Sequence, residues 1–129
     1  MVSIMLYVKC GVSDEYGNTI IPYIYDKVKI LFNNYIRVWK EGKAGLYNPS
    51  GKLLIEVQYE GIYVFDKKIY VKKDEKIGLY NMKGEMLIPC IFDKIIDKDT
   101  YFIVYLKDKK GIYDMKNDII TINCEFENN

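Results

Sequence analysis

The stretch GLYNPSGK at residues 45–52 recurs as GLYNMKGE at residues 78–85, which is 33 residues later. Gly111 follows Gly78 by the same distance, and Gly11 precedes Gly45 by 34 residues. An internal period of roughly 20 to 50 residues is typical of repeat proteins. The 129 residues therefore read as one domain, residues 1–129, made of four similar units that start near Gly11, Gly45, Gly78 and Gly111.

The quoted stretches have the composition of a tight turn. An Asp or Asn stands three residues after each glycine, and a Gly or Asn stands six residues after it. An Asp or Asn side chain can accept hydrogen bonds from its own backbone, and Gly or Asn tolerates a left-handed backbone conformation. Each unit is therefore predicted to end one strand, turn and begin the next at these positions: Asp14, Asn48, Asn81 and Asp114, followed by Gly17, Gly51, Gly84 and Asn117.

The rest of each repeat also has the composition of β-strands. The turn is followed by TIIPYIYD, LLIEVQYE or MLIPCIFD, and the repeat closes with YIRVWK, KIYVKK or YFIVYL. Runs of β-branched and aromatic residues between turn signals indicate an all-β protein, and no helical period is present. Pro22 and Pro89 share one position of the repeat and predict a bend or bulge there. The expected fold is a stack of antiparallel β-hairpin repeats of about 33 residues.

The pattern resembles that of the WG-repeat family, whose unit has the form (D)GKxGLIDxxGKxIIPxxYDxI. The match is EGKAGLYNPSGKLLIEVQYEGI at residues 41–62 and DEKIGLYNMKGEMLIPCIFDKI at residues 74–95, with a weaker copy at residues 10–28 and a partial one from Gly111. The tryptophan of the family signature is replaced here by Cys10, Ala44, Ile77 and Lys110. The resemblance implies stacked β-hairpins and a role in binding, with no catalytic residues to carry over.

The composition restricts the partners and the chemistry. The net charge of +1 gives no overall field for nucleic acid or an anionic membrane. The chain has no histidine, no CxxC and no glycine-rich phosphate loop, so we expect no metal and no cofactor. Three widely spaced cysteines predict free thiols. The first ten residues lack the features of a signal peptide, and the protein is expected to be cytoplasmic.

Asp26, Glu60 and Asp93 are the carboxylates that could carry out acid–base chemistry. All three occupy the same position of the repeat. A residue type that recurs in every unit serves the unit, whereas catalysis needs a single constellation. We therefore expect a structural role at a turn or strand end, no catalytic residue, and a protein that is not an enzyme.

The closing strand of each repeat predicts both a core face and a candidate binding face. Ile36, Ile69 and Phe102, and Val38, Val71 and Val104, are uniformly apolar and should face the core. Alternate positions lie on the opposite face of a strand and carry the only tryptophan and the only arginine. These types are enriched at binding hot spots. The candidate binding residues are Tyr35, Arg37, Trp39, Tyr70, Lys72 and Tyr105; packing as a second core layer or as cross-strand pairs is the alternative.

The expected function is protein binding. The sharpest hypothesis is a small intracellular inhibitor or immunity-type protein, bacterial or from a phage, that blocks a bacterial toxin or an RNA-guided defence nuclease. An adaptor for a peptide or cell component is the first alternative. A single-stranded nucleic-acid binder is the second, because lysines cluster at residues 66–76 and 106–111. No membrane partner is expected, and the oligomeric state is left open.

Overall fold

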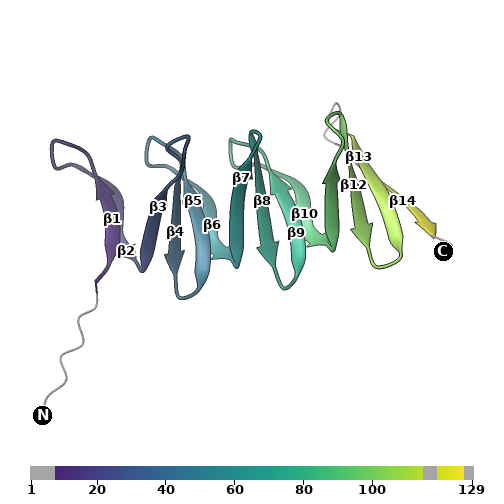
Figure 1. The fold of residues 1–129 in the computed structure, drawn as a ribbon, viewed down its shortest axis with the longest axis horizontal. Helices are drawn as coiled ribbons and strands as arrows, with labels where there is room; N and C mark the ends of the chain where they lie inside the picture. Colours follow the sequence, from purple (N-terminus) through teal and green to yellow (C-terminus); the bar gives the residue numbers. More distant parts are fainter. Residues whose placement is uncertain (1–7, 115–118, 127–129) are drawn as a thin grey trace, which may run out of the picture. The chain divides into compact units, whose positions relative to one another are not determined.

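The computed structural model describes residues 8–114 and 119–126, and every helix or strand found in these ranges is a β-strand (Figure 1). The chain divides into two compact units: unit 1 is Met1–Tyr59 and unit 2 is Glu60–Asn129. The predicted all-β fold of antiparallel hairpin repeats is confirmed. No helix capable of spanning a membrane occurs in the described residues.

Unit 1 contains two antiparallel sheets. The first pairs β1 (Cys10–Ser13) with β2 (Thr19–Tyr25). The second has the order β3-β4-β5-β6 and consists of β3 (Lys27–Ile30), β4 (Ile36–Lys40), β5 (Lys43–Tyr47) and β6 (Leu53–Tyr59). The two sheets pack through a cluster formed by Ile21, Tyr25, Ile36, Val38 and Tyr47.

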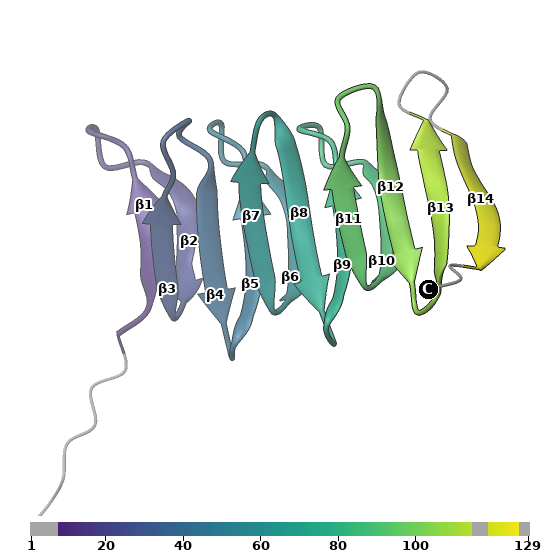
Figure 2. The same cartoon turned by 45° about the vertical axis from the view of Figure 1, so that its right-hand side comes forward.

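Unit 2 repeats this design with two four-stranded sheets. One has the order β7-β8-β9-β10 and contains β7 (Gly61–Phe65), β8 (Lys68–Lys73), β9 (Lys76–Tyr80) and β10 (Met86–Phe92). The other has the order β11-β12-β13-β14 and contains β11 (Lys94–Asp97), β12 (Tyr101–Leu106), β13 (Lys109–Asp114) and β14 (Ile119–Phe126). In Figure 2 the edge strands β7 and β11 lie on the same side of this unit.

Each repeat supplies four strands, whereas the sequence pattern predicts three. The additional strands are β3, β7 and β11, which have four or five residues. They were missed because only one residue, Asp26, Glu60 or Asp93, separates each of them from the preceding strand. The chain leaves one sheet at this residue and enters the next, so a sheet combines the last two strands of one repeat with the first two strands of the following repeat.

These corner carboxylates hold the bend between the sheets. A carboxylate oxygen of Asp26 accepts a hydrogen bond from the backbone N–H of Glu41 at 2.8 Å. The other two accept equivalent bonds, Glu60 from the N–H of Asp74 at 2.9 Å and Asp93 from that of Lys107 at 2.7 Å. The expected structural role of this repeat position is therefore confirmed.

The Asp and Asn residues of the quoted stretches close the turns as predicted. Oδ1 of Asn48 accepts hydrogen bonds from the N–H groups of Ser50 and Lys52 at 3.0 and 2.9 Å. Asp14 and Asn81 accept the equivalent pairs of bonds. Gly17, Gly51 and Gly84 have left-handed φ values of 87°, 91° and 87°. The fourth copy of the turn, with Asn117, lies outside the described residues.

Gly51→Val is expected to lower the free energy of unfolding by about 1–3 kcal/mol, because a β-branched residue is strained at positive φ. A Cβ at Gly51 would also lie 2.9 Å from Cγ2 of Ile20. Gly17→Val is the matched control, since its φ is similar and no heavy atom lies within 4 Å of its Cβ position. Denaturant unfolding should rank Gly51→Val below Gly17→Val and both below wild type. An unchanged midpoint for Gly51→Val would contradict the turn assignment.

The glycines that define the repeat lie opposite bulged segments of the neighbouring strand. Val12 pairs with Ile21 and Cys10 with Tyr25, so Gly11 faces three residues of β2. The same irregularity occurs opposite Gly45 and Gly78. Pro22 and Pro89 lie within the bulged segments, and the predicted bulge at this repeat position is confirmed.

The closing-strand positions that were predicted to face the core do so. Residues 36, 38, 69, 71, 102 and 104 are all at most 4% exposed. In unit 2, Phe102 and Val104 pack against Leu79, Ile88 and Phe92 of the preceding sheet. The packed layer of each unit is therefore formed between its two sheets.

Candidate functional site

The β3–β4 hairpin brings three of the six candidate residues onto one face. Arg37 and Trp39 alternate with the buried Ile36 and Val38 along β4, and Tyr35 directly precedes the strand. Period two therefore places Tyr35, Arg37 and Trp39 on the face opposite to Ile36 and Val38. All three side chains are half-buried. We call these three residues the β4 stripe.

Two cations contact the tryptophan of the β4 stripe. The Nζ atom of Lys27, whose Cα pairs with that of Trp39 across the hairpin, lies 4.8 Å from the centre of the ring. The guanidinium carbon of Arg37 lies 4.9 Å from it. Each cation–π contact at a site of this exposure contributes about 0.5–1 kcal/mol. The stripe is therefore held in place within the hairpin.

The loop at the end of this hairpin exposes an aromatic side chain. Residues 31–35 join β3 to β4, and the side chain of Phe32 in this loop is fully exposed. Ile30, at the end of β3, is 56% exposed. Sequence reasoning did not select either residue, because both stand outside the closing strand. The signal available was the length of this loop compared with the equivalent loops of the other repeats.

The three candidate residues of unit 2 do not form one surface. Tyr70 pairs with Leu79, so it lies on the face of its sheet that packs against Phe102 and Val104. Tyr105 alternates with Phe102 and Val104 along β12 and faces the other way. The prediction assumed that equivalent faces are continuous, but each closing strand belongs to a separate sheet.

Tyr70 lies at the edge of the layer between the two sheets of unit 2. It is half-buried and packs against the core cluster of this unit. Burial raises the pKa of its phenol above the ordinary value, and the nearby Asp97 carboxylate acts in the same direction. Lys72 is on the same face of the sheet and is exposed. For Tyr70 the alternative of a second core layer describes the observed packing.

Tyr105 takes part in a contact that repeats the one at Trp39. The Nζ atom of Lys94, the cross-strand partner of Tyr105, lies 5.8 Å from the centre of its ring. Lys27 and Lys94 occupy the same position of the repeat, as do Trp39 and Tyr105. The aromatic residue at this position thus has a structural role in two repeats. In the middle repeat these two positions hold Gly61 and Lys72, which pair with each other and include no aromatic ring.

Unit 2 exposes two aromatic residues that were not selected from the sequence. Tyr63 and Phe65 on the edge strand β7 are 55% and 71% exposed. The phenol oxygen of Tyr63 would lie 2.7 Å from a Cβ at Gly61, so its ring extends over this glycine. Neither residue occupies a closing strand, and their exposure could not be read from the alternation of β7 alone.

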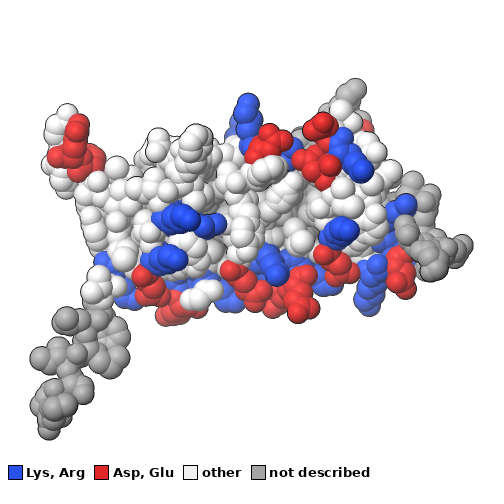
Figure 3. Space-filling model, viewed as in Figure 1, with Lys and Arg blue, Asp and Glu red and all other residues white. Residues whose placement is uncertain are grey.

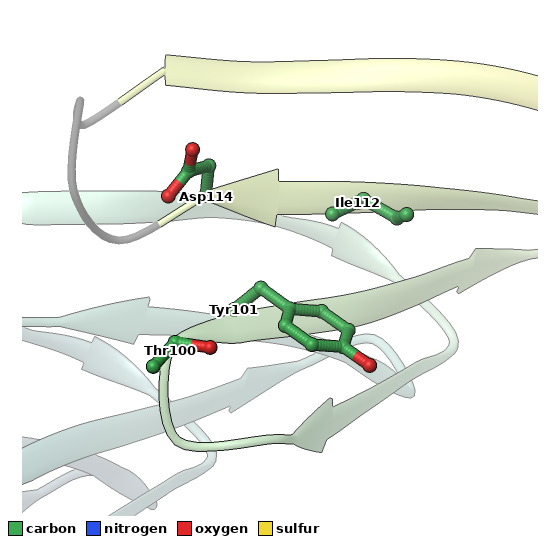
Figure 4. A pocket seen from close by; sticks show the side chains of 4 residues that line it. All are labelled: Thr100, Tyr101, Ile112 and Asp114. Atoms are coloured by element: carbon green, nitrogen blue, oxygen red, sulfur yellow. The ribbon is translucent and has the colours of Figure 1, made fainter.

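A hollow of about 460 Å³ is present beside the β11–β12 loop and is lined by Thr100, Tyr101, Ile112 and Asp114 (Figure 4). Asp114, the charged residue of this lining, has the repeat position at which Asp or Asn closes the turn in the other repeats. Among the described lining residues, the charged group is therefore one that belongs to the regular repeat. Within the described ranges, no group of three or more Cys, Asp or Glu residues could hold a metal ion.

The comparison with known families supports the repeat reading. A family model described as WG containing repeat matches residues 11–43, 45–76 and 77–109. The three matches cover most of the chain and begin at or next to the glycines Gly11, Gly45 and Gly78. No curated protein matches the sequence.

Proposed function

Because the chain belongs to the WG repeat family, we propose that it is a non-enzymatic protein-binding module of the cytoplasm that contacts its partner through the β3–β4 hairpin. Its role is that of a small inhibitor or immunity-type protein. It blocks a bacterial toxin or an RNA-guided defence nuclease by occupying a surface of that protein.

The observation that carries this proposal is the difference between the β3–β4 hairpin and its equivalents. It has the only Trp and the only Arg of the chain, and they lie side by side in the β4 stripe. Aromatic residues and arginine are the types that most often supply binding energy at protein interfaces. A repeat protein needs the same residues in every unit for its fold, so residues present in a single unit are available for binding.

The carboxylates support the non-enzymatic part of the proposal. The three corner carboxylates each hold a backbone N–H group of a neighbouring hairpin. Lys9 and Lys76 also form ion pairs with Asp26 and Asp93 and hold the pKa of both carboxyls below the usual range. An acid held ionised in this way is a poor proton donor at neutral pH.

The test is capture of one partner by the tagged full chain in its native host, followed by affinity measurements with the purified pair. Arg37→Ala is expected to weaken binding about tenfold or more, as truncation of an interface arginine often does. Lys72→Ala and Tyr105→Ala are the controls, since these residues occupy the repeat position of Trp39 on other sheets. The partner's own activity should fall when the wild-type chain is added.

Two results would overturn the proposal. If no protein is captured in a stoichiometric amount, the binding function itself is wrong. If Lys72→Ala or Tyr105→Ala weakens binding while Arg37→Ala does not, the partner does not bind at the β3–β4 hairpin. Thermal unfolding of each variant shows whether a loss of binding follows from a loss of folding.

A further inference from the structure

We propose that Phe32 is an anchor residue that inserts into an apolar pocket on an acidic face of the partner protein. The inference rests on the proposed function and adds the kind of surface that the partner presents. It follows from the structure of the β3–β4 loop, the exposure of Phe32 and the charge of the hairpin.

The β3–β4 loop is longer than the equivalent loops and has a defined structure. It contains five residues, whereas residues 66–67 join β7 to β8 and residues 98–100 join β11 to β12. Leu31 N–H donates to the carbonyl of Tyr35 at 2.7 Å, and Asn34 N–H donates to the carbonyl of Leu31 at 2.9 Å. Asn34 takes the left-handed conformation with φ of 65°. The additional residues thus form a closed turn that presents Phe32 at its first central position.

The exposure of Phe32 has no compensation within the hairpin. Tyr16, on another turn of unit 1, is 82% exposed, but its phenol oxygen can bond to water. The ring of Phe32 has no polar atom and is fully exposed. Turns favour small or polar residues at such positions. The ring of Phe32 therefore contributes favourable free energy only when another apolar surface removes it from water.

The charge of the hairpin indicates which charges surround the pocket on the partner protein. Residues 27–40 contain Lys27, Lys29, Arg37 and Lys40 and no acidic residue. The whole chain has a net charge of +1, so the remaining residues carry −3. The equivalent hairpins contain acids, namely Asp66 in one and Asp97 and Asp99 in the other.

Lys29 and Arg37 form the second cross-strand pair from the loop, and Lys27 lies further along the same hairpin. Lys27 and Lys29 on β3 are exposed. Figure 3 shows blue side chains gathered over β3 and β4. A local charge of this sign attracts an acidic surface, raises the association rate and disfavours basic partners. The hairpin therefore fits an apolar pocket that is surrounded by carboxylates.

A protein partner fits these features better than single-stranded nucleic acid or a membrane. Proteins that bind single strands stack successive bases on several exposed rings. On this hairpin Lys27 and Arg37 lie over the ring of Trp39, and Phe32 is the fully exposed aromatic residue. Binding at a membrane interface needs a wide apolar face rather than one exposed ring on a turn in which two asparagines follow it.

The experiment places a photoreactive phenylalanine analogue at position 32 of the full chain in its native host. The matched control carries the same analogue at position 16, which is an exposed aromatic position of unit 1 beside acidic residues. Irradiation is expected to join position 32 to one protein, at a segment that combines apolar and acidic residues. Position 16 should give little or no adduct with that protein.

Affinities measured with the identified protein complete the test. Phe32→Ala is expected to weaken binding about 30-fold or more, as loss of an anchor does, with an unchanged unfolding temperature because the side chain is exposed. Lys29→Glu should slow association and reduce its dependence on salt. Tyr16→Ala should bind as wild type does.

The outcomes separate this inference from the proposed function. If a partner is captured but Phe32→Ala binds it as wild type does, or positions 32 and 16 give equal adducts, the anchor is wrong and the binding function survives. Binding to a 20-residue oligothymidine or to phosphatidylserine vesicles that Phe32→Ala abolishes would replace the protein partner by nucleic acid or by a membrane. Capture of no protein would remove both proposals.

Discussion

Gly78→Ala is expected to lower the free energy of unfolding by about 3 kcal/mol or more, a large effect for one methyl group. A Cβ at Gly78 would lie 2.9 Å from both the Cα and the backbone nitrogen of Cys90. These atoms belong to the bulged strand β10, so a rotation of a side chain cannot relieve the overlap. Overpacking of this kind typically costs about 1–3 kcal/mol, and the effect is expected at the upper end or above because the contact is with backbone.

The matched control for Gly78→Ala is Gly42→Ala. Gly42 has φ of 77° but no heavy atom within 4 Å of its Cβ position. Alanine there should cost about 1 kcal/mol from backbone strain alone. Both variants are compared by urea unfolding of the full chain. If Gly78→Ala unfolds at the wild-type midpoint, the close approach of the bulged strand β10 to Gly78 does not exist as described.

Trp39→Ala and Val38→Ala should have opposite effects although the two residues are neighbours in β4. Trp39→Ala removes the ring of the β4 stripe, and binding is expected to weaken by about 2 kcal/mol, which is about 30-fold. Its stability should fall by the loss of two cation–π contacts of about 0.5–1 kcal/mol each and of the burial of the half-buried ring beside Ala44. Val38→Ala leaves a cavity in the core of unit 1 and should cost about 2–3 kcal/mol of stability.

The comparison is made on the folded fraction of each variant, by calorimetric titration below its unfolding temperature. Folded Val38→Ala is expected to bind the partner with wild-type affinity. Trp39→Phe, which keeps an aromatic ring, should recover part of the binding. A Trp39→Ala protein that fails to fold while Val38→Ala is stable would mean that the face of β4 that carries Trp39, rather than the face that carries Val38, supports the core.

The turns and the core were predictable because they depend on local chemistry that recurs. An Asp or Asn three residues after each glycine leaves few alternatives to a side-chain-closed turn, and the structure has this turn at residues 14, 48 and 81. Positions of the closing strands that are apolar in every repeat are likewise compatible only with a buried environment. Cys10 and Cys90 are free thiols, as predicted, whereas the side chain of Cys124 lies outside the described residues.

The division of the repeat into sheets was not predictable from the pattern. Asp26 separates β2 from β3, yet one residue between two apolar runs gives no turn signal of the usual kind. A carboxylate that bonds to the N–H of Glu41, 15 positions away, makes this bend possible. Such a contact depends on tertiary structure and has no local signature.

The candidate site was predictable in part, because alternation along a strand determines the faces of that strand. Alternation along β4 correctly placed Tyr35, Arg37 and Trp39 on one face. It could not show that Tyr70 and Tyr105 belong to different sheets, because alternation assigns a face to a strand without assigning the strand to a sheet. The exposed Phe32 was overlooked because the prediction followed the closing strands, and Phe32 lies in the loop before one of them.

The bend at a single carboxylate has a consequence for cutting and recombining this protein. A 33-residue piece that begins at Gly78, as the sequence period suggests, would cut through β9 and divide a sheet. A piece that begins and ends at the corners, such as residues 61–92, would carry the complete sheet β7–β10 with its hairpins intact. Grafting, duplication or removal of repeats should therefore be planned from corner to corner, and each corner lies 15 residues after the glycine at which the sequence period starts.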